Sequence, residues 1–389
     1  MNRRTFLATT AGGLSLLAGC SGGPNRELPT RPAGQWMQHA HDARNTGAAD
    51  VTVPARAAPA WDEGVAQLAA PLVADGTAFS VAAEATAVDA RTGSERWRVE
   101  LEGTADHTPA LLDDRLVVAA ETRLVALARD DGSELWSRPL PRPARGGPTV
   151  AADQSLLAVP VAETGLVAFD AGTGEESWRA PMLGARRPAI ADGRVYAAGY
   201  KRDGDTGVLR GLAATDGTRQ WETELGHPDT APVVADGGVI VADGGTLAVH
   251  DPADGTRTRT LGSVGDHVDV PPAIADGTAF VATTDGRLLA RSIADGTQAW
   301  RADVHVTVDT GVSVGREAVV AAATGLPESG GPGIVALERS DGSVRWEHGI
   351  EGFDAVVSTP PVLADGAVLY ASNESTGVVA LGDLPPRDE

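Results

Sequence analysis

The stretch "AVDARTGSERW", residues 87–97, recurs along the chain in altered form about every forty residues. Its constant elements are a glycine preceded by Thr or Asp and a tryptophan four residues after that glycine. A Thr-Gly or Asp-Gly pair between two strands is typical of a tight hairpin turn, since glycine accepts the positive φ that such turns need. Arg259 stands where one tryptophan is missing from the series. The tryptophans are Trp61, Trp97, Trp136, Trp178, Trp221, Trp300 and Trp346, separated by 36, 39, 42, 43, 79 and 46 residues.

Each repeat also contains a second turn, usually Asp-Gly, between short apolar runs, as in "PLVADGTAFSVA" at residues 71–82. Two hairpins make a unit of four short antiparallel strands. A sheet this small cannot bury both faces alone, so such units stack radially. The sequence therefore predicts an all-β fold, an eight-bladed β-propeller of four-stranded antiparallel blades. The innermost strands are expected to begin near Pro71, Pro109, Pro148, Pro188, Pro232, Pro272, Val312 and Pro361.

The two ends of the chain are expected to share one blade. The eighth unit stops after Leu384 without a tryptophan-bearing strand, and the strand around Trp61 has no blade of its own. Pairing the two would close the ring and remove a free sheet edge that invites aggregation. Each tryptophan is expected to pack its blade against the next one, because an indole side chain buries about 150–250 Å².

The N-terminus has the pattern of a processing signal. Arg3 and Arg4 precede an apolar stretch, "FLATTAGGLSLLAGC", that is too short to span a bilayer. The arginine pair resembles a twin-arginine export signal, and "LAGC" resembles a lipoprotein cleavage site that leaves Cys20 lipidated; an ordinary signal peptide with an incidental cysteine is the alternative. Cys20 is the only cysteine, so it has no disulfide partner. We expect an exported protein anchored on the outer face of the cytoplasmic membrane, with signal 1–20, flexible tether 21–35, propeller 36–384 and tail 385–389.

The chain is strongly acidic, with 53 acidic residues against 32 basic ones and a formal net charge of −21. Such a surface repels nucleic acid. Lys201 is the single lysine. Acidity with arginine in place of lysine resembles proteins adapted to molar salt, where screening shortens the range of self-repulsion. The composition thus predicts a halophilic source, and the alternative is a soluble acidic protein from a GC-rich genome.

Two repeats carry a family resemblance. "AVDARTGSERW" and "AFDAGTGEESW" match the pattern A-x-D-x-x-T-G-x-x-x-W of the pyrroloquinoline quinone (PQQ)-type propeller repeat, and the other repeats match it in part. The resemblance covers residues 60–384, and "GQWMQHAHDARNTG" at residues 34–47 is similar to the opening segment of that family. The family includes quinoprotein dehydrogenases, the lipoprotein scaffold of outer-membrane β-barrel assembly and many other surface lipoproteins. The resemblance implies a propeller lipoprotein, here from a halophilic archaeon, and fold does not choose among the functions.

The residues that quinoprotein catalysis would need are largely missing. The resemblance would place PQQ and a calcium ion over the channel, with Asp, Glu and Asn ligands and commonly a Cys-Cys disulfide, and this chain has no Cys-Cys. It also has no H-E-x-x-H or P-loop motif, and its one G-x-S-x-G match, "GVSVG" at residues 311–315, falls on an expected innermost strand. His39 and His41 form an H-x-H pair that could ligate a metal, but no third ligand is nearby in sequence. We therefore expect no enzyme activity, no cofactor and no metal, with PQQ and calcium as the alternative.

One polar site is predicted at a channel mouth. The linkers that precede the innermost strands should ring one end of the channel, and they carry both carboxylates and arginines. This pattern favours a polar or cation site, although any water-filled channel mouth needs polar residues. The candidate residues are Asp106, His107, Arg145, Arg186, Arg187, Asp229, Asp269 and Asp309.

These observations favour a non-catalytic, monomeric scaffold or binding module with a protein partner. A quinoprotein-like dehydrogenase and a sensor or solute-binding lipoprotein are the alternatives. Asn373, in "NES", fits a glycosylation acceptor.

Overall fold

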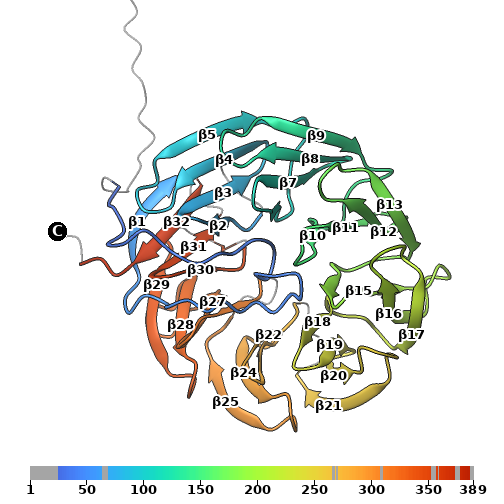
Figure 1. Ribbon diagram of the computed structural model, residues 1–389. Coiled ribbons are helices and arrows are strands. Elements are labelled where there is room, and N and C mark those ends of the chain that lie inside the picture. The colour runs from blue at the N-terminus through green and yellow to red at the C-terminus, as the bar shows by residue number, and fades with distance from the viewer. Residues whose placement is uncertain are drawn as a thin grey trace, which may run out of the picture.

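The computed structural model describes eight four-stranded antiparallel sheets arranged as blades in a closed ring (Figure 1). The predicted fold class and blade number are confirmed. No helix occurs in the part of the chain described, and therefore none there is long and apolar enough to cross a membrane. We call the space enclosed by the innermost strands the channel. The described residues are 25–63, 69–264, 268, 270–306, 310–351, 356–357, 359–372 and 377–385.

In blades 1 to 4 the strands run in sequence order from the channel outward. The innermost strands are only two or three residues long, and they are buried because the rest of the blade and the neighbouring blades cover them. The strands are β2 Leu72–Ala74, β3 Thr77–Val81, β4 Glu84–Asp89 and β5 Glu95–Glu100; β6 Ala110–Leu111, β7 Arg115–Ala120, β8 Arg123–Ala128 and β9 Glu134–Pro139; β10 Thr149–Val150, β11 Leu156–Val161, β12 Gly165–Asp170 and β13 Glu176–Pro181; β14 Ala189–Ala191, β15 Arg194–Tyr200, β16 Gly207–Ala213 and β17 Arg219–Leu225.

Blade 8 joins the two ends of the chain, as predicted. Its strand order is β1-β32-β31-β30, and Trp61 in β1 pairs with Ala380 in β32. Blades 5 to 7 repeat the order of the first four. The strands are β18 Val233–Ala235, β19 Gly238–Asp243, β20 Thr246–His250 and β21 Arg257–Ser263; β22 Ala273–Ala275, β23 Thr278–Ala282, β24 Arg287–Ser292 and β25 Gln298–Asp303; β26 Val312–Val314, β27 Ala318–Ala323, β28 Gly333–Glu338 and β29 Val344–Gly349; β30 Val362–Ala364, β31 Ala367–Ala371, β32 Val378–Gly382 and β1 Ala58–Glu63.

The tryptophans of the repeat lie between neighbouring blades. The Trp97 ring of blade 1 covers Gly132 in the turn of blade 2, and its indole N–H donates to Arg129 O at 2.9 Å. Trp346 has no such turn ahead of it, and its N–H donates instead to Pro54 O at 2.8 Å. The turn glycine is required for two reasons, its positive φ and the ring against it. The same glycine-on-ring contact joins Gly93 to Trp61, Gly174 to Trp136, Gly217 to Trp178, Gly255 to Trp221 and Gly342 to Trp300.

This contact makes the turn glycine intolerant of a side chain. Gly174 has a φ of +70°, and a Cβ built on it would lie 2.6 Å from the Trp136 ring. We expect Gly174→Ala to lower the free energy of unfolding by about 2–4 kcal/mol, through left-handed strain and overpacking. Urea unfolding followed by circular dichroism would measure it. Gly331→Ala is the control, because Gly331 has no positive φ and no atom within 4 Å of its built Cβ; equal losses in the two variants would refute the role of the contact.

The seam between blades 5 and 6 is built differently, because the tryptophan is missing there. Arg259 is exposed and does not fill the gap. The backbone of Leu261, a residue that is 1% exposed, lies against Gly296 of the next blade instead. Arg291 completes the seam by donating from Nη1 to Leu261 O and Gly296 O, both at 3.1 Å. In the other repeats the position of Arg291 is occupied by an apolar residue or by His250, so two departures from the repeat pattern meet at one seam.

Residues 33–52 form a belt that runs around the channel and touches all eight blades in ring order. Figure 1 shows this blue segment crossing the middle of the ring. The innermost strand of each blade has a free edge, and the belt supplies acceptors to it. The N–H groups that donate to the belt are those of Val73 to Trp36 O, Leu111 to Met37 O, Val150 to Gln38 Oε1, Ile190 to Ala43 O, Val234 to Arg44 O, Ile274 to Thr46 O, Val314 to Gly47 O and Gly366 to Thr52 O.

The belt lies at the end of the channel opposite the linkers. In a four-stranded meander the linkers between blades and the middle turn share one face, here called the linker face, and the first and last turns share the other, the turn face. Asp50 of the belt accepts a hydrogen bond from Arg316 in the first turn of blade 7, and Arg31, just before the belt, donates to Asp89 at the last turn of blade 1. The path is tightly curved, since Ala40 and His41 have φ values of 51° and 75°, unusual for residues other than glycine.

Candidate functional site

The anchor and export residues, Cys20, Arg3 and Arg4, lie outside the described residues, and so do Asp269, Asp309 and Asn373. The chain is described from residue 25, inside the segment predicted to be tether. Its described part is held against blades 1 and 8: Leu28 N–H donates to Arg91 O at 2.9 Å, and Arg26 N–H donates to Ala60 O at 2.8 Å. Residues 25–32, called the arm, are therefore part of the folded ring, and the prediction of a flexible tether up to residue 35 is wrong for them.

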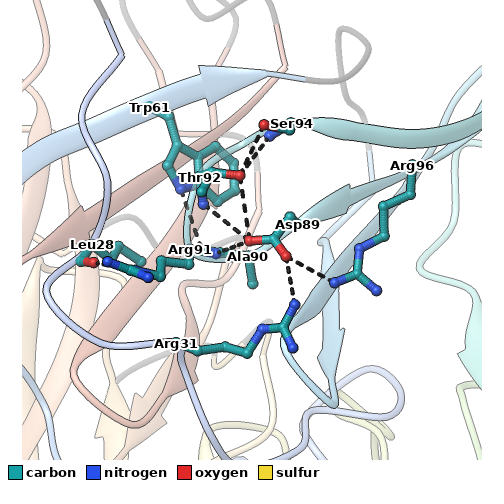
Figure 2. A network of polar contacts seen from close by, with 9 residues as sticks. All are labelled: Leu28, Arg31, Trp61, Asp89, Ala90, Arg91, Thr92, Ser94 and Arg96. Atoms are coloured by element: carbon teal, nitrogen blue, oxygen red, sulfur yellow. Dashed lines mark hydrogen bonds and ion pairs between the residues drawn. The ribbon is translucent and has the colours of Figure 1, made fainter.

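Asp89 connects the arm to the turn of blade 1 against which Trp61 of blade 8 packs, and the Trp61 N–H donates to the neighbouring Ala90 O (Figure 2). One carboxylate oxygen accepts the backbone N–H groups of Arg91 and Thr92, which shapes the turn. The other accepts Arg31 Nη2 at 2.6 Å and Arg96 Nη2 at 2.8 Å. Partial burial opposes ionisation, but the hydrogen bonds from Arg96, Arg31 and the two backbone groups outweigh it and hold the pKa of Asp89 far below its usual range.

We expect Asp89→Asn to release the arm. A carboxyl with a lowered pKa in the folded state stabilises the fold above its unfolded pKa, about 4, and loses that contribution as the pH falls toward the folded value. Cleavage by trypsin after Arg26 should therefore be several-fold faster in Asp89→Asn at pH 7. Asp131→Asn, which changes an exposed turn carboxylate of blade 2 that bonds to Ser133 of its own turn, is the control, and equal cleavage of all three proteins would count against the clamp.

The predicted channel-mouth residues divide into three groups. Asp229 is only 3% exposed, and its carboxylate accepts the N–H of Gly245 at 2.9 Å, so it ties a linker to the turn between β19 and β20. Asp106 is exposed and lies 3.5 Å from His107 Nε2. Arg145 and Arg186 are exposed, and Arg186 Nε donates to Pro228 O at 3.3 Å. The described carboxylates therefore do not converge on one point.

Arg187 differs from its neighbour Arg186 because it is directed into the protein. It is half-buried, and its Nη1 donates to Pro148 O at 3.1 Å. A Cβ built on Gly147 would lie 3.0 Å from Arg187 Nη2, so the guanidinium lies against the linker of the preceding blade. Burial lowers the pKa of Arg187 to about 9, and the group still carries its charge at neutral pH.

His39 joins Arg187 at this point, which the sequence did not indicate. The belt places His39 in the channel, where burial, Arg187 and His107 together lower its pKa to about 3. Burial also lowers the pKa of His107, and Arg187 adds to this effect, although Asp106 and a hydrogen bond to Ala144 O oppose it. His39, His107 and Arg187 therefore form one electrostatic group, here called the channel cluster. Its sequence signal was hidden, because its members are 68 and 80 residues apart and belong to no motif.

The channel also contains a small cavity beside His39. Its volume is about 70 Å³, and it is lined by Trp36, His39, Asn45 and residues of blades 6 to 8. Asn45 donates to Pro188 O and Pro232 O, and its Oδ1 has no partner. His41 packs edge-on against Trp36, with ring centroids 5.2 Å apart. No group of three His, Cys, Asp or Glu side chains that could hold a metal ion occurs among the residues described.

The comparisons with known proteins point to one family. The family model described as "Outer membrane protein assembly factor BamB" matches residues 35–139, 120–263 and 206–388. The curated relative "Outer membrane protein assembly factor BamB" of Yersinia pestis is 27% identical over 244 residues, which are 56% of this chain and 59% of the relative. The match thus spans less than two thirds of that relative's length.

Solved structures share the fold at low identity. The crystal structure of BamB from Moraxella catarrhalis has a TM-score of 0.64 and 16% identity, covering 82% of this chain and 94% of that one. Quinohemoprotein alcohol dehydrogenase from Comamonas testosteroni has a TM-score of 0.69 and 15% identity, covering 91% and 81%. These likenesses show the propeller architecture, which an assembly factor and a dehydrogenase share.

Proposed function

Because the chain belongs to the family of outer membrane protein assembly factor BamB, we propose that it is a non-catalytic scaffold that binds a protein partner outside the cytoplasmic membrane. The observation that carries this proposal is the family match, which extends from residue 35 to residue 388 and so includes both the belt and the whole ring. The relative's name describes an assembly factor. In a cell without an outer membrane, the partner would belong to another surface assembly.

The architecture supports a scaffold in two ways. Indole rings at the blade seams and a belt bonded to every blade make the ring rigid, and a rigid surface loses little conformational entropy on binding. The net charge of −21 keeps the surface hydrated and favours activity at high salt, in keeping with a halophilic archaeal source. We propose that the protein is a monomer that does not bind nucleic acid.

The described residues do not fit the alternative cofactor. Pockets for small molecules and cofactors usually measure about 300–1,000 Å³, whereas the cavity in the channel measures about 70 Å³. Asn45, the channel asparagine, uses its amide nitrogen on two carbonyl groups. Calcium prefers six to eight oxygen ligands, including carboxylates, and no such carboxylate group occurs among the described residues. PQQ with calcium therefore has no place in the proposal.

The localisation part is tested at the N-terminus. We expect Cys20→Ser to release the protein into the medium, because the lipidated thiol would be its only attachment. Arg3→Lys combined with Arg4→Lys should retain the precursor inside the cell. Immunoblots of medium, membrane and cytosol fractions would measure both effects, with Ser21→Ala as a control expected to stay on the membrane. Unchanged membrane association of Cys20→Ser would contradict the lipid anchor.

The scaffold part is tested by crosslinking on the intact cell. A photo-crosslinking amino acid at Arg202 samples the linker face of blade 4, and one at Thr215 samples its turn face; both positions are exposed. We expect one face to capture the same protein repeatedly and the other to capture none. No capture from either face, together with quinone absorbance and dye reduction after incubation with PQQ and calcium, would favour the dehydrogenase instead.

A further inference from the structure

Arg187 is an arginine without an anion in a chain rich in anions. Many other arginines pair with carboxylates, as the mostly buried Arg129 does with Asp75 and Arg316 does with Asp50, both at 2.6 Å. Arg187 has one hydrogen bond, to Pro148 O, and no ion pair within the part of the chain described. Buried charges are normally paired. The guanidinium therefore keeps N–H donors for which the described residues supply no acceptor.

The groups around Arg187 would favour an anion over a cation. His39 and His107 are its neighbours in the channel cluster, and a positive charge on any member disfavours a charge on the others. At neutral pH this leaves one fixed positive charge and two neutral imidazoles, of which His107 donates its single N–H to Ala144 O. Asp106 lies beside His107 but is exposed and 3.5 Å away. The positive charge of the Arg187 guanidinium would repel a divalent cation at this point.

We propose that the channel binds a small carboxylate anion between Arg187 and the imidazole of His39, next to His107. A guanidinium binds a carboxylate through two parallel hydrogen bonds, which gives both strength and orientation. The belt closes the turn face, so the anion enters from the linker face. The carboxylate can belong to a free organic acid or to an acidic side chain of a partner loop inserted into the mouth. The site for a free organic acid is independent of the proposed scaffold role, whereas the partner-loop version rests on it.

The matched pair Arg187 and Arg186 provides the test, because adjacent arginines differ in direction. Isothermal titration calorimetry of the full-length mature protein with sodium acetate and sodium succinate, at constant chloride and ionic strength, should show binding. Arg187→Gln should weaken it about tenfold to a hundredfold, as expected for the loss of a charged hydrogen-bonded pair. Arg186→Gln should change it less than about twofold, since its guanidinium is exposed.

A second pair of ligands separates the two sources of the carboxylate. A short glutamate-containing peptide and its glutamine counterpart are titrated in the same way. Binding of the free acids, or binding of the glutamate peptide alone, supports the site and identifies the source. No carboxylate binding by the wild type, or equal binding by Arg187→Gln, overturns it. If Arg187→Gln unfolds, His39→Gln replaces it, and an unchanged affinity in a folded His39→Gln protein likewise overturns the site.

Discussion

Ala60→Asp is expected to open the closing blade and to lower the free energy of unfolding by about 3–5 kcal/mol. Ala60 lies in β1, the outer strand of blade 8, which pairs with β32, and its side chain is fully buried. An unpaired carboxylate there must either leave the core or keep its proton at a cost. Loss of β1 would expose the edge of β32, which could then pair with another molecule.

Pro59→Asp is the matched control, because Pro59 is the neighbouring residue on the same strand and is exposed. Limited proteolysis and light scattering at high salt would compare the two. We expect Ala60→Asp to be cleaved within residues 361–384 and to aggregate, and Pro59→Asp to resemble the wild type. Identical behaviour of the two variants would show that β1 does not hold the ring closed.

Trp97→Ala is expected to cost about 3–5 kcal/mol, the usual loss for removing a large buried aromatic side chain. The ring is 8% exposed and packs on Gly132 of the next blade, so its removal leaves a cavity at a seam between blades. Urea unfolding at high salt, followed by circular dichroism, would measure the change. Leu135→Ala, on the outer strand of blade 2 with 47% of its surface exposed, should cost less than about 0.5 kcal/mol.

Phenylalanine substitutions separate the ring from its hydrogen bond. Trp97 donates to Arg129 O, whereas the Trp136 N–H is buried with no partner among the described residues. Trp97→Phe should therefore cost about 1 kcal/mol more than Trp136→Phe. If Trp97→Ala and Leu135→Ala unfold at the same urea concentration, the packing role of the Trp97 ring is wrong. If Trp97→Phe and Trp136→Phe unfold at the same urea concentration, the stabilising role of the hydrogen bond to Arg129 O is wrong.

Local chemistry made the blades predictable from the sequence. The turn of each blade needs a glycine because of its positive φ and because the tryptophan of the preceding blade covers it. The glycine, with its own tryptophan four residues later, therefore recurs wherever a blade recurs. Counting these repeats predicted eight blades, and the unpaired strand around Trp61 predicted the closure that β1 and β32 make. Composition likewise argued against nucleic acid as a partner, since net charge is a sum over residues and needs no structure.

The belt and the channel cluster were decided only by the tertiary structure. The belt accepts backbone N–H groups from Val73 to Gly366, and every residue except proline has such a group, so no side-chain pattern marks the contact. The missing tryptophan alone does not predict the seam of Leu261 and Arg291, because Arg291 donates there to backbone carbonyl groups, which every residue has. In the sequence His39 belongs to a polar segment, and only the closed propeller brings it to Arg187. Proximity across blades depends on how the repeats close in space, and the sequence encodes that closure through packing rather than through any local motif.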